Sequence, residues 1–368
     1  MNQKERITEL QLAVLIAAGF VELGLYSFPR DLSGISGRQH LFSLGLLLVI
    51  GLATVWVLAY FSLYFGGRSA VEAIFHVVGR PLGLVMTIPA IAFHLFLGAV
   101  CLRYFADFTN TFFLPKTPPE AIMLLIILAV IFVVGQGFAA GARLAVAMVP
   151  AFFVLVLVAY LLVGSKITEW GAVFPSTDLW PPNFLAGTSR IIYLVVGLET
   201  IPFFLPLVGK LNRPYLWVTL PMVANGVLLL VISVVTFGVL GLEPTGLLQY
   251  PGATALRTLR MPGLLVERTG ALIALAWTVL KVGYLGVRVT TSGMAICTCF
   301  GMSVSRYRSF LLPLAVIVFY MARWPADTEE LEHLLTSWIG TAGLVMNLGY
   351  ALFLLLIGWA RGKGVRST

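Results

Sequence analysis

Residues 19–30 read GFVELGLYSFPR, and they place the carboxylate of Glu22 inside an otherwise apolar segment. Gly19, Gly24 and Pro29 in the same stretch weaken or remove the backbone hydrogen bonds of a helix. Within a bilayer, freed backbone groups and ionised side chains are tolerated only where other protein or a water-filled cavity surrounds them. The stretch therefore predicts a membrane helix that is interrupted near its middle and faces a polar cavity.

The composition is that of a polytopic membrane protein. Apolar residues make up 59% of the 368 residues and charged residues 11%, whereas about a quarter of the residues of soluble domains are charged. The net charge of +8 resides mostly in short loops between apolar runs, so it indicates membrane topology and not nucleic-acid binding. The first apolar segment lacks a small-residue cleavage pattern, so we expect it to be retained as a helix.

Ten apolar runs are long enough to cross a bilayer, which requires about twenty residues. They cover residues 8–33, 41–66, 82–111, 119–140, 143–163, 185–208, 215–241, 264–300, 309–323 and 335–360. The eighth run is longer than one crossing needs, so we expect it to tilt or to extend beyond the bilayer. The predicted fold class is an all-α membrane protein with ten transmembrane helices.

The distribution of charge between the loops predicts the orientation. With the amino terminus inside, the inner loops and both tails hold twelve Lys and Arg residues against nine in the outer loops. Acidic residues follow the opposite trend, with three inside and eleven outside. Because basic residues are retained on the cytoplasmic side, we expect both termini in the cytoplasm.

The ten runs divide into two halves of five within one transmembrane domain, residues 1–368. Repeat one covers 8–163 and repeat two covers 185–360; an odd number of helices per half inverts the second half, as in many transporters. ELGLYSFP (22–29) and ETIPFFLP (199–206) each hold a Glu followed seven residues later by a Pro. The pattern predicts a 5+5 inverted repeat in which helices 1 and 6 are both broken.

Charged residues inside the runs are the candidates for function, because lipid rejects them. At about 1.5 Å rise per residue, Glu22 and Glu199 lie near the bilayer centre, and Lys281 is expected at a similar depth as their cationic partner. The pair either lines a ligand site or is a purely structural buried pair. For Arg103 and Arg288, snorkelling to an interface or an outer cavity is an equal alternative.

Other side chains carry weaker signals. Tyr284 and Tyr193 are expected near the cavity, and His94 is interpreted as a packed core residue. Catalytic and metal-binding patterns are lacking from the sequence, and Cys101, Cys297 and Cys299 all lie inside apolar runs. GQGFAAG (135–141) lacks the Lys-Ser/Thr of a phosphate loop. We therefore expect no enzyme, no cofactor, no metal site and no disulfide.

The order of the motifs resembles that of the spore germination permease family, the B subunits of germinant receptors within the amino acid–polyamine–organocation superfamily. The stretches that carry the resemblance are ITELQLAVLIAAGFVELGLYSFPRD, LRYFADFTNTFFLPKTPPEAI, VVGLETIPFFLPLV and LRMPGLLVERTGALIALAW. The resemblance implies a leucine-transporter-like fold in the spore inner membrane. It also implies a small germinant, often an amino acid, and a complex with an A-type membrane subunit and a C-type lipoprotein.

The resemblance places the ligand between broken helices 1 and 6. The expected ligand-binding residues are Gly19, Glu22, Leu23, Gly24, Leu25, Gly197, Leu198, Glu199, Thr200 and Tyr284, and the expected charge-coupling residues are Lys281, Arg103 and Arg288. Glu22 stands where the family usually has a small residue. Germinant sensing is the leading hypothesis, the alternatives being a proton-coupled amino-acid transporter and a structural scaffold for an ion-conducting partner.

Overall fold

The computed structural model of the chain describes residues 6–20, 23–174, 181–258 and 269–364. These residues form helices, and the extended pairing among them is a single bridge between Ile7 and Val208. The α-helices are α1 (Glu9–Phe20), α2 (Phe28–Ser33), α3 (His40–Tyr64), α4 (Ala70–Val78), α5 (Arg80–Phe112), α6 (Pro119–Gly135), α7 (Phe138–Gly164), α8 (Trp170–Val173), α9 (Pro181–Arg190), α10 (Ile201–Phe204), α11 (Pro214–Leu240), α12 (Leu242–Leu247), α13 (Pro251–Arg257), α14 (Thr269–Cys299), α15 (Leu311–Ala322), α16 (Thr328–His333), α17 (Gly340–Leu344) and α18 (Tyr350–Ala360).

Shorter turns of tighter or wider helix join these elements. The 3₁₀ segments are η2 (Gly37–Gln39), η3 (Ile192–Thr200), η4 (Leu205–Leu207) and η6 (Val304–Phe310), and the π-helical segments are η7 (Leu334–Ile339) and η8 (Val345–Gly349). The two π segments join α16, α17 and α18 into one continuous element of 33 residues. π-helical turns are rare in proteins, and those that occur often lie at functional sites.

The chain is an integral membrane protein with several spans. Six of the described helical segments are long and apolar enough to cross a bilayer, and a bent pair, Asn183–Arg190 with Ile192–Leu207, makes a seventh. α1 and α6 are shorter apolar helices. The predicted fold class is thus confirmed, whereas the total of ten spans and the division into two inverted repeats stay predictions.

Both predicted interruptions are present. α1 ends at Phe20 and α2 begins at Phe28, and between them Gly24 adopts a φ of 66°, which glycine tolerates best. The carbonyl of Gly24 accepts hydrogen bonds from the amides of Ser27 (3.1 Å) and Phe28 (2.9 Å). In the sixth span, α9 meets η3 at a bend of 43°. Val21 and Glu22 lie outside the described residues.

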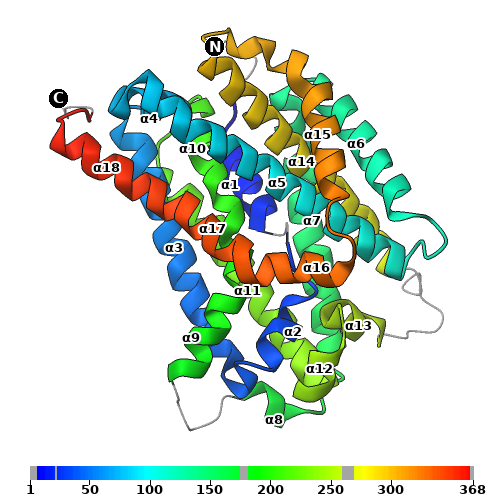
Figure 1. Ribbon diagram of the computed structural model, residues 1–368. Helices are drawn as coiled ribbons and strands as arrows, with labels where there is room; N and C mark the ends of the chain where they lie inside the picture. The colour runs from blue at the N-terminus through cyan, green and yellow to red at the C-terminus, as the bar shows by residue number, and fades with distance from the viewer. Residues whose placement is uncertain (1–5, 21–22, 175–180, 259–268, 365–368) are drawn as a thin grey trace.

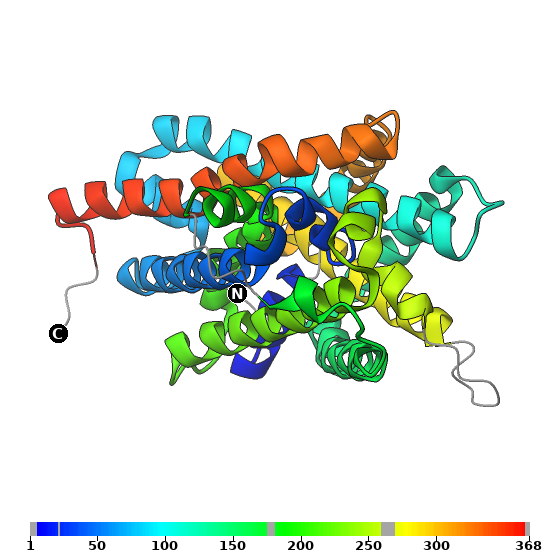
Figure 2. The ribbon, with the colours of Figure 1, turned by 90° about the horizontal axis from the view of Figure 1, so that it is seen from below.

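The two interrupted spans cross inside the bundle. The first broken span lies in the centre of the molecule, enclosed by the longer helices (Figures 1 and 2). Residues 12–20 of α1 are all buried, as expected of a helix that is apolar on every side. α1 packs against η3, α7, α11 and α14. Interrupted backbone is therefore surrounded by protein and not by lipid, which satisfies the rule for irregular backbone in membranes.

Two glycines make the crossing possible. A Cβ atom added to Gly197 would lie 2.5 Å from the carbonyl oxygen of Gly19, and a Cβ added to Gly19 would lie 3.3 Å from the carbonyl oxygen of Gly197. The two backbones are thus in direct contact, as at the small-residue crossings of other membrane helices. The fold depends on glycine most strictly at position 197.

We predict that Gly197→Ala destabilises the protein by about 1–3 kcal/mol, because the new methyl group forces the two backbones apart. Gly45→Ala is the matched control, since nothing lies within 4 Å of its added Cβ and alanine favours a helix. Reversible unfolding in mixed micelles measures both variants. Equal stability of the two variants would contradict the proposed close crossing.

Candidate functional site

An inner polar cluster lies beyond the crossing, where η3 meets α5 and α14. Nη1 of Arg288 donates to Oε1 of Glu199 (2.7 Å), to Nδ1 of His94 (2.9 Å) and to the carbonyl of His94 (3.2 Å). Nη2 of Arg288 donates to the hydroxyl of Tyr284. The guanidinium is fully buried, so its charge is balanced by Glu199 within the protein.

The histidine of this cluster contacts both members of the ion pair. Nδ1 of His94 lies 2.9 Å from Nη1 of Arg288 and 3.3 Å from Oε1 of Glu199. Nε2 of His94 lies 2.8 Å from Oγ1 of Thr291, whose hydroxyl donates to the carbonyl of Val287. A chain of polar contacts therefore runs from Glu199 through α5 to α14.

A cavity of about 90 Å³ lies beside Glu199. Since one buried water needs about 10–15 Å³, it has room for several water-sized groups. Side chains of α3, α4, α5, α10, α14 and α18 line it, and most of them are apolar. The polar residues of the lining include Thr87, His94, Glu199, Ser292 and Asn347. A concave, mostly apolar pocket with a few polar groups is the usual form of a small-molecule site.

A second, larger cavity of about 720 Å³ adjoins the first, and Val71, Phe203 and Ala295 line both. Its wall includes Arg6 near the start of the chain and Ser69 at the start of α4. The other end of α4 receives the end of the chain, because Nζ of Lys363 donates to its carbonyls. Both chain ends thus lie at one end of the bundle (Figure 1), which we call the terminal face.

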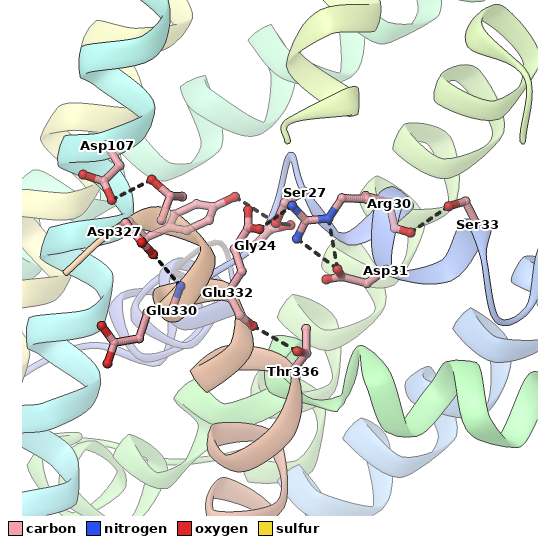
Figure 3. Close-up of polar contacts among 12 residues, drawn as sticks. Gly24, Ser27, Arg30, Asp31, Ser33, Asp107, Asp327, Glu330, Glu332 and Thr336 are labelled. Carbon is pink, nitrogen blue, oxygen red and sulfur yellow. Dashed lines mark hydrogen bonds and ion pairs between the residues drawn. The ribbon is translucent and has the colours of Figure 1, made fainter. Parts of the chain in front are cut away.

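An outer polar cluster closes the opposite side of the crossing. Nη1 of Arg30 lies 2.5 Å from Oε2 of Glu332, and Nη2 of Arg30 lies 3.1 Å from Oδ1 of Asp31. The hydroxyl of Tyr193 donates to Oδ2 of Asp31 (2.7 Å). Figure 3 shows Arg30 between Asp31 and Glu332. This cluster ties α2 to α16 and to the start of η3.

Aromatic side chains pack beside the outer cluster. The ring of Tyr26, in the break of the first span, stacks on Phe108 (5.3 Å between centroids) and meets Trp277 edge-on (5.0 Å). Tyr250 packs against Phe108 as well (5.2 Å). These rings and the outer cluster pack together on that side, whereas the two cavities described above adjoin the terminal face.

Of the residues predicted to bind ligand, Glu199 lines the 90 Å³ cavity. Gly19 and Gly197 contact each other, Gly24 packs against the ring of Tyr193, and Thr200 donates its hydroxyl to the carbonyl of Gly197 (2.9 Å). Three further predicted residues are buried side chains, namely Leu23, Leu25 and Leu198. Tyr284 binds Arg288, and Glu22 lies outside the described residues.

Glu199 pairs with Arg288 and not with Lys281, whereas the predicted partnership of Lys281 with Glu22 falls on a glutamate outside the described residues. Nζ of Lys281 donates to Sγ of Cys101 (3.5 Å) and lies 5.0 Å from the ring centroid of Trp277. The prediction counted about 1.5 Å of rise per residue, but a 3₁₀ segment rises about 2.0 Å, so an α-helical count does not give the depth of Glu199 on η3.

Arg103 takes part in a separate ion pair. Its Nε lies 2.9 Å from Oδ1 of Asp107 one helical turn further on, and both side chains are largely buried. Oδ2 of Asp107 accepts from the hydroxyl of Thr328 (3.3 Å). Arg103 is thus paired within α5 and, through Asp107, linked to Thr328 at the start of α16.

The sequence analysis missed two parts of this arrangement. His94 was interpreted as a packed core residue, although it contacts the Glu199–Arg288 pair. Arg30 and Asp31 were not counted among the charges within spans, although they follow Pro29 directly inside the first predicted span. Adjacent charges of opposite sign just after a helix break are the signal that could have identified them.

Comparison with known sequences gives a consistent result. A model of the family described as spore germination protein matches residues 6–331. Spore germination protein B2 of Bacillus subtilis (strain 168) is 18% identical over 365 residues, covering 98% of each chain. Spore germination protein YndE of the same organism is 24% identical over 276 residues, covering 74% of this chain and 75% of that protein.

Solved structures show which fold this is. A Na⁺-coupled sialic acid symporter aligns with a TM-score of 0.68 at 13% identity, covering 95% of this chain and 79% of its own. MHP1, a nucleobase-cation-symport-1 family transporter, aligns with a TM-score of 0.68 at 11% identity, and the alignment covers 98% of this chain and 93% of MHP1. A manganese transporter of Eremococcus coleocola aligns with a TM-score of 0.62 at 16% identity, and the alignment covers 95% of this chain and 78% of the transporter chain. The fold is the predicted leucine-transporter-like one, and these proteins are transporters and not enzymes.

We predict that Arg288→Gln destabilises the protein by about 3–5 kcal/mol, because it leaves the Glu199 carboxylate buried without its counter-charge. The double variant Glu199→Gln/Arg288→Gln is expected to recover about 1–3 kcal/mol relative to the sum of the single variants. The free energies of unfolding of the parent, the two single variants and the double variant, measured in mixed micelles, form a double-mutant cycle. The exposed Arg323→Gln is the control. Simple additivity would rule out the ion pair.

We also predict that Glu332→Gln loosens the outer cluster, because Arg30 loses its charged partner on α16. Amide hydrogen exchange in residues 28–33 is expected to quicken about tenfold. Glu329→Gln, an exposed acid on the same helix, is expected to leave that exchange unchanged. If the amides of residues 28–33 exchange equally fast in both variants, the Arg30–Glu332 ion pair does not hold α2 in place.

Proposed function

Because this chain belongs to the spore germination protein family, we propose that it is the B subunit of a germinant receptor, which senses a small molecule inside the membrane. Membership is supported along nearly the whole chain by the match over residues 6–331. The fold shared with symporters supports a ligand site at the broken helices, where such folds hold their substrates.

One observation carries the proposal most directly. The carboxylate of Glu199, at the end of the irregular segment η3, is part of a buried ion pair and also lines a cavity. Charges at such depth are costly unless they serve a structure or a ligand. Its Oε2 atom is buried and makes no hydrogen bond, so the ion pair with Arg288 leaves part of the carboxylate for a ligand.

Sensing follows from the two polar clusters on either side of the crossing. A germinant, which we expect to be an amino acid, binds beside Glu199 and contacts η3, α5, α14 and η8 together. Because η3 carries both Gly197 of the crossing and Tyr193 of the outer cluster, binding favours one arrangement of the two halves over another. The shift can be no larger than the difference in affinity for the two arrangements.

The assembly and location are parts of the same proposal. We assign the chain to the spore inner membrane with both termini in the cytoplasm, as the loop charges favour. The terminal face and its 720 Å³ cavity then open to the spore core. An A-type membrane subunit and a C-type lipoprotein complete the receptor and receive the conformational signal.

We predict that Glu199→Gln raises the germinant concentration needed for half-maximal dipicolinate release by tenfold or more. The change removes the anionic group from the cavity wall. Glu243→Gln, an exposed acid on α12, is the control and is expected to respond as the parent does. A normal dose response in Glu199→Gln spores that hold the assembled receptor would overturn the proposed site. Loss of assembly without a shifted dose response would favour a scaffold.

A second candidate function is a proton-coupled amino-acid transporter. It is favoured by the contact of two titratable groups, His94 and Glu199 (3.3 Å), beside a cavity that adjoins the terminal face. Reconstituted vesicles with a pH gradient separate the two functions. Accumulation of labelled amino acid indicates transport, and saturable binding without uptake indicates sensing.

A further inference from the structure

The 90 Å³ cavity is lined by an unusual set of polar atoms. Four of the side chains in its wall each hold a buried oxygen without a hydrogen-bond partner. These atoms are Oγ1 of Thr87, Oε2 of Glu199, Oγ of Ser292 and Oδ1 of Asn347. Each orphaned oxygen costs free energy in an apolar setting, so four around one cavity indicate a polar guest.

The chemistry of these oxygens specifies the guest. A carboxylate oxygen and an amide carbonyl oxygen can only accept hydrogen bonds, whereas a hydroxyl can accept or donate. Nδ2 of Asn347 already faces the carbonyls of Val195 (3.5 Å) and Val196 (3.4 Å) in η3, so its Oδ1 points the other way. The cavity thus presents an excess of hydrogen-bond acceptors to whatever enters it, one of them the free oxygen of the Glu199 carboxylate.

No Lys or Arg occurs among the residues described as lining this cavity. The nearby guanidinium of Arg288 already binds Glu199, His94 and Tyr284. The rest of the wall is apolar and includes Phe61, Ile91, Met346 and Leu354. A group with several N–H donors, a positive charge and a short apolar substituent matches this wall, and a carboxylate does not.

We propose that the cavity beside Glu199 is a site for a primary ammonium group on a small apolar chain. The –NH₃⁺ donates its three hydrogen bonds among Glu199 Oε2, Asn347 Oδ1 and the two hydroxyls, which lie on η3, η8, α5 and α14. Its apolar chain lies against the apolar part of the wall, and the cavity volume of about 90 Å³ limits the guest to a small molecule. The inference deepens the proposed function, since it names the part of the germinant that this site recognises.

The test uses the purified full chain in micelles and measures binding of n-propylammonium chloride by calorimetry. Neutral n-propanol and sodium propionate have the same chain without the ammonium, and sodium chloride tests a bare cation. We expect saturable binding of n-propylammonium alone. Equal binding of n-propanol or propionate, or binding of sodium in place of the amine, overturns the proposal.

Variants of the wall test the role of each oxygen. Thr87→Val, Ser292→Ala and Asn347→Leu are each expected to weaken n-propylammonium binding about fivefold or more, and Glu199→Gln about tenfold or more. Thr290→Val is the matched control, because Oγ1 of Thr290 is also buried without a partner but is not among the described lining residues. If Thr87→Val and Asn347→Leu bind as Thr290→Val does, the proposal fails.

Germination assays on the same variants distinguish this inference from the proposed function. Spores of Glu199→Gln that fail to respond, together with unaltered n-propylammonium binding, overturn the ammonium site and leave the receptor role standing. Amine binding that requires the four oxygens, together with a normal germinant response of Glu199→Gln spores, supports the ammonium site and overturns its role in sensing.

Discussion

The bilayer's rejection of charge and of unpaired backbone is the constraint on which this structure depends. Glu199 and Arg288 are sheltered because the spans that carry or surround them cross at the centre of the bundle. The crossing in turn exists because Gly19 and Gly197 let two backbones touch. A charged pair, an irregular helix and a glycine contact are therefore one feature of the molecule, and the cavity beside Glu199 is its consequence.

The two sides of the crossing differ in physical character. On the outer side, Arg30 joins Asp31 and Glu332, and aromatic rings fill the remaining space. On the side of the terminal face, two adjoining cavities are present. The two described cavities thus lie on the side of the terminal face. In a fold of this kind, a ligand shifts the equilibrium between two arrangements of the halves by its different affinity for them.

Sequence reasoning predicted the parts of the fold that follow from local chemistry. Apolar length identified the membrane spans, and Gly24, Pro29, Gly197 and Pro202 indicated the two interruptions. It predicted the buried acid Glu199 but not its pairing with Arg288, because an α-helical count does not give the depth of a residue on the 3₁₀ segment η3. Asn347, supplied by a π-helical turn far along the chain, carries no sequence signal that links it to Glu199.

The cavity beside the Glu199–Arg288 pair adjoins the larger cavity at the terminal face, so it is expected to admit water and small solutes from that face. The most direct measurement is the reaction of Ala295→Cys, in a chain whose three native cysteines are replaced, with a membrane-impermeant cationic thiol reagent added at the terminal face. Ala315→Cys, buried in α15, is the comparison. The account predicts rapid labelling of position 295 and slow labelling of 315. Equally slow labelling of both would contradict it.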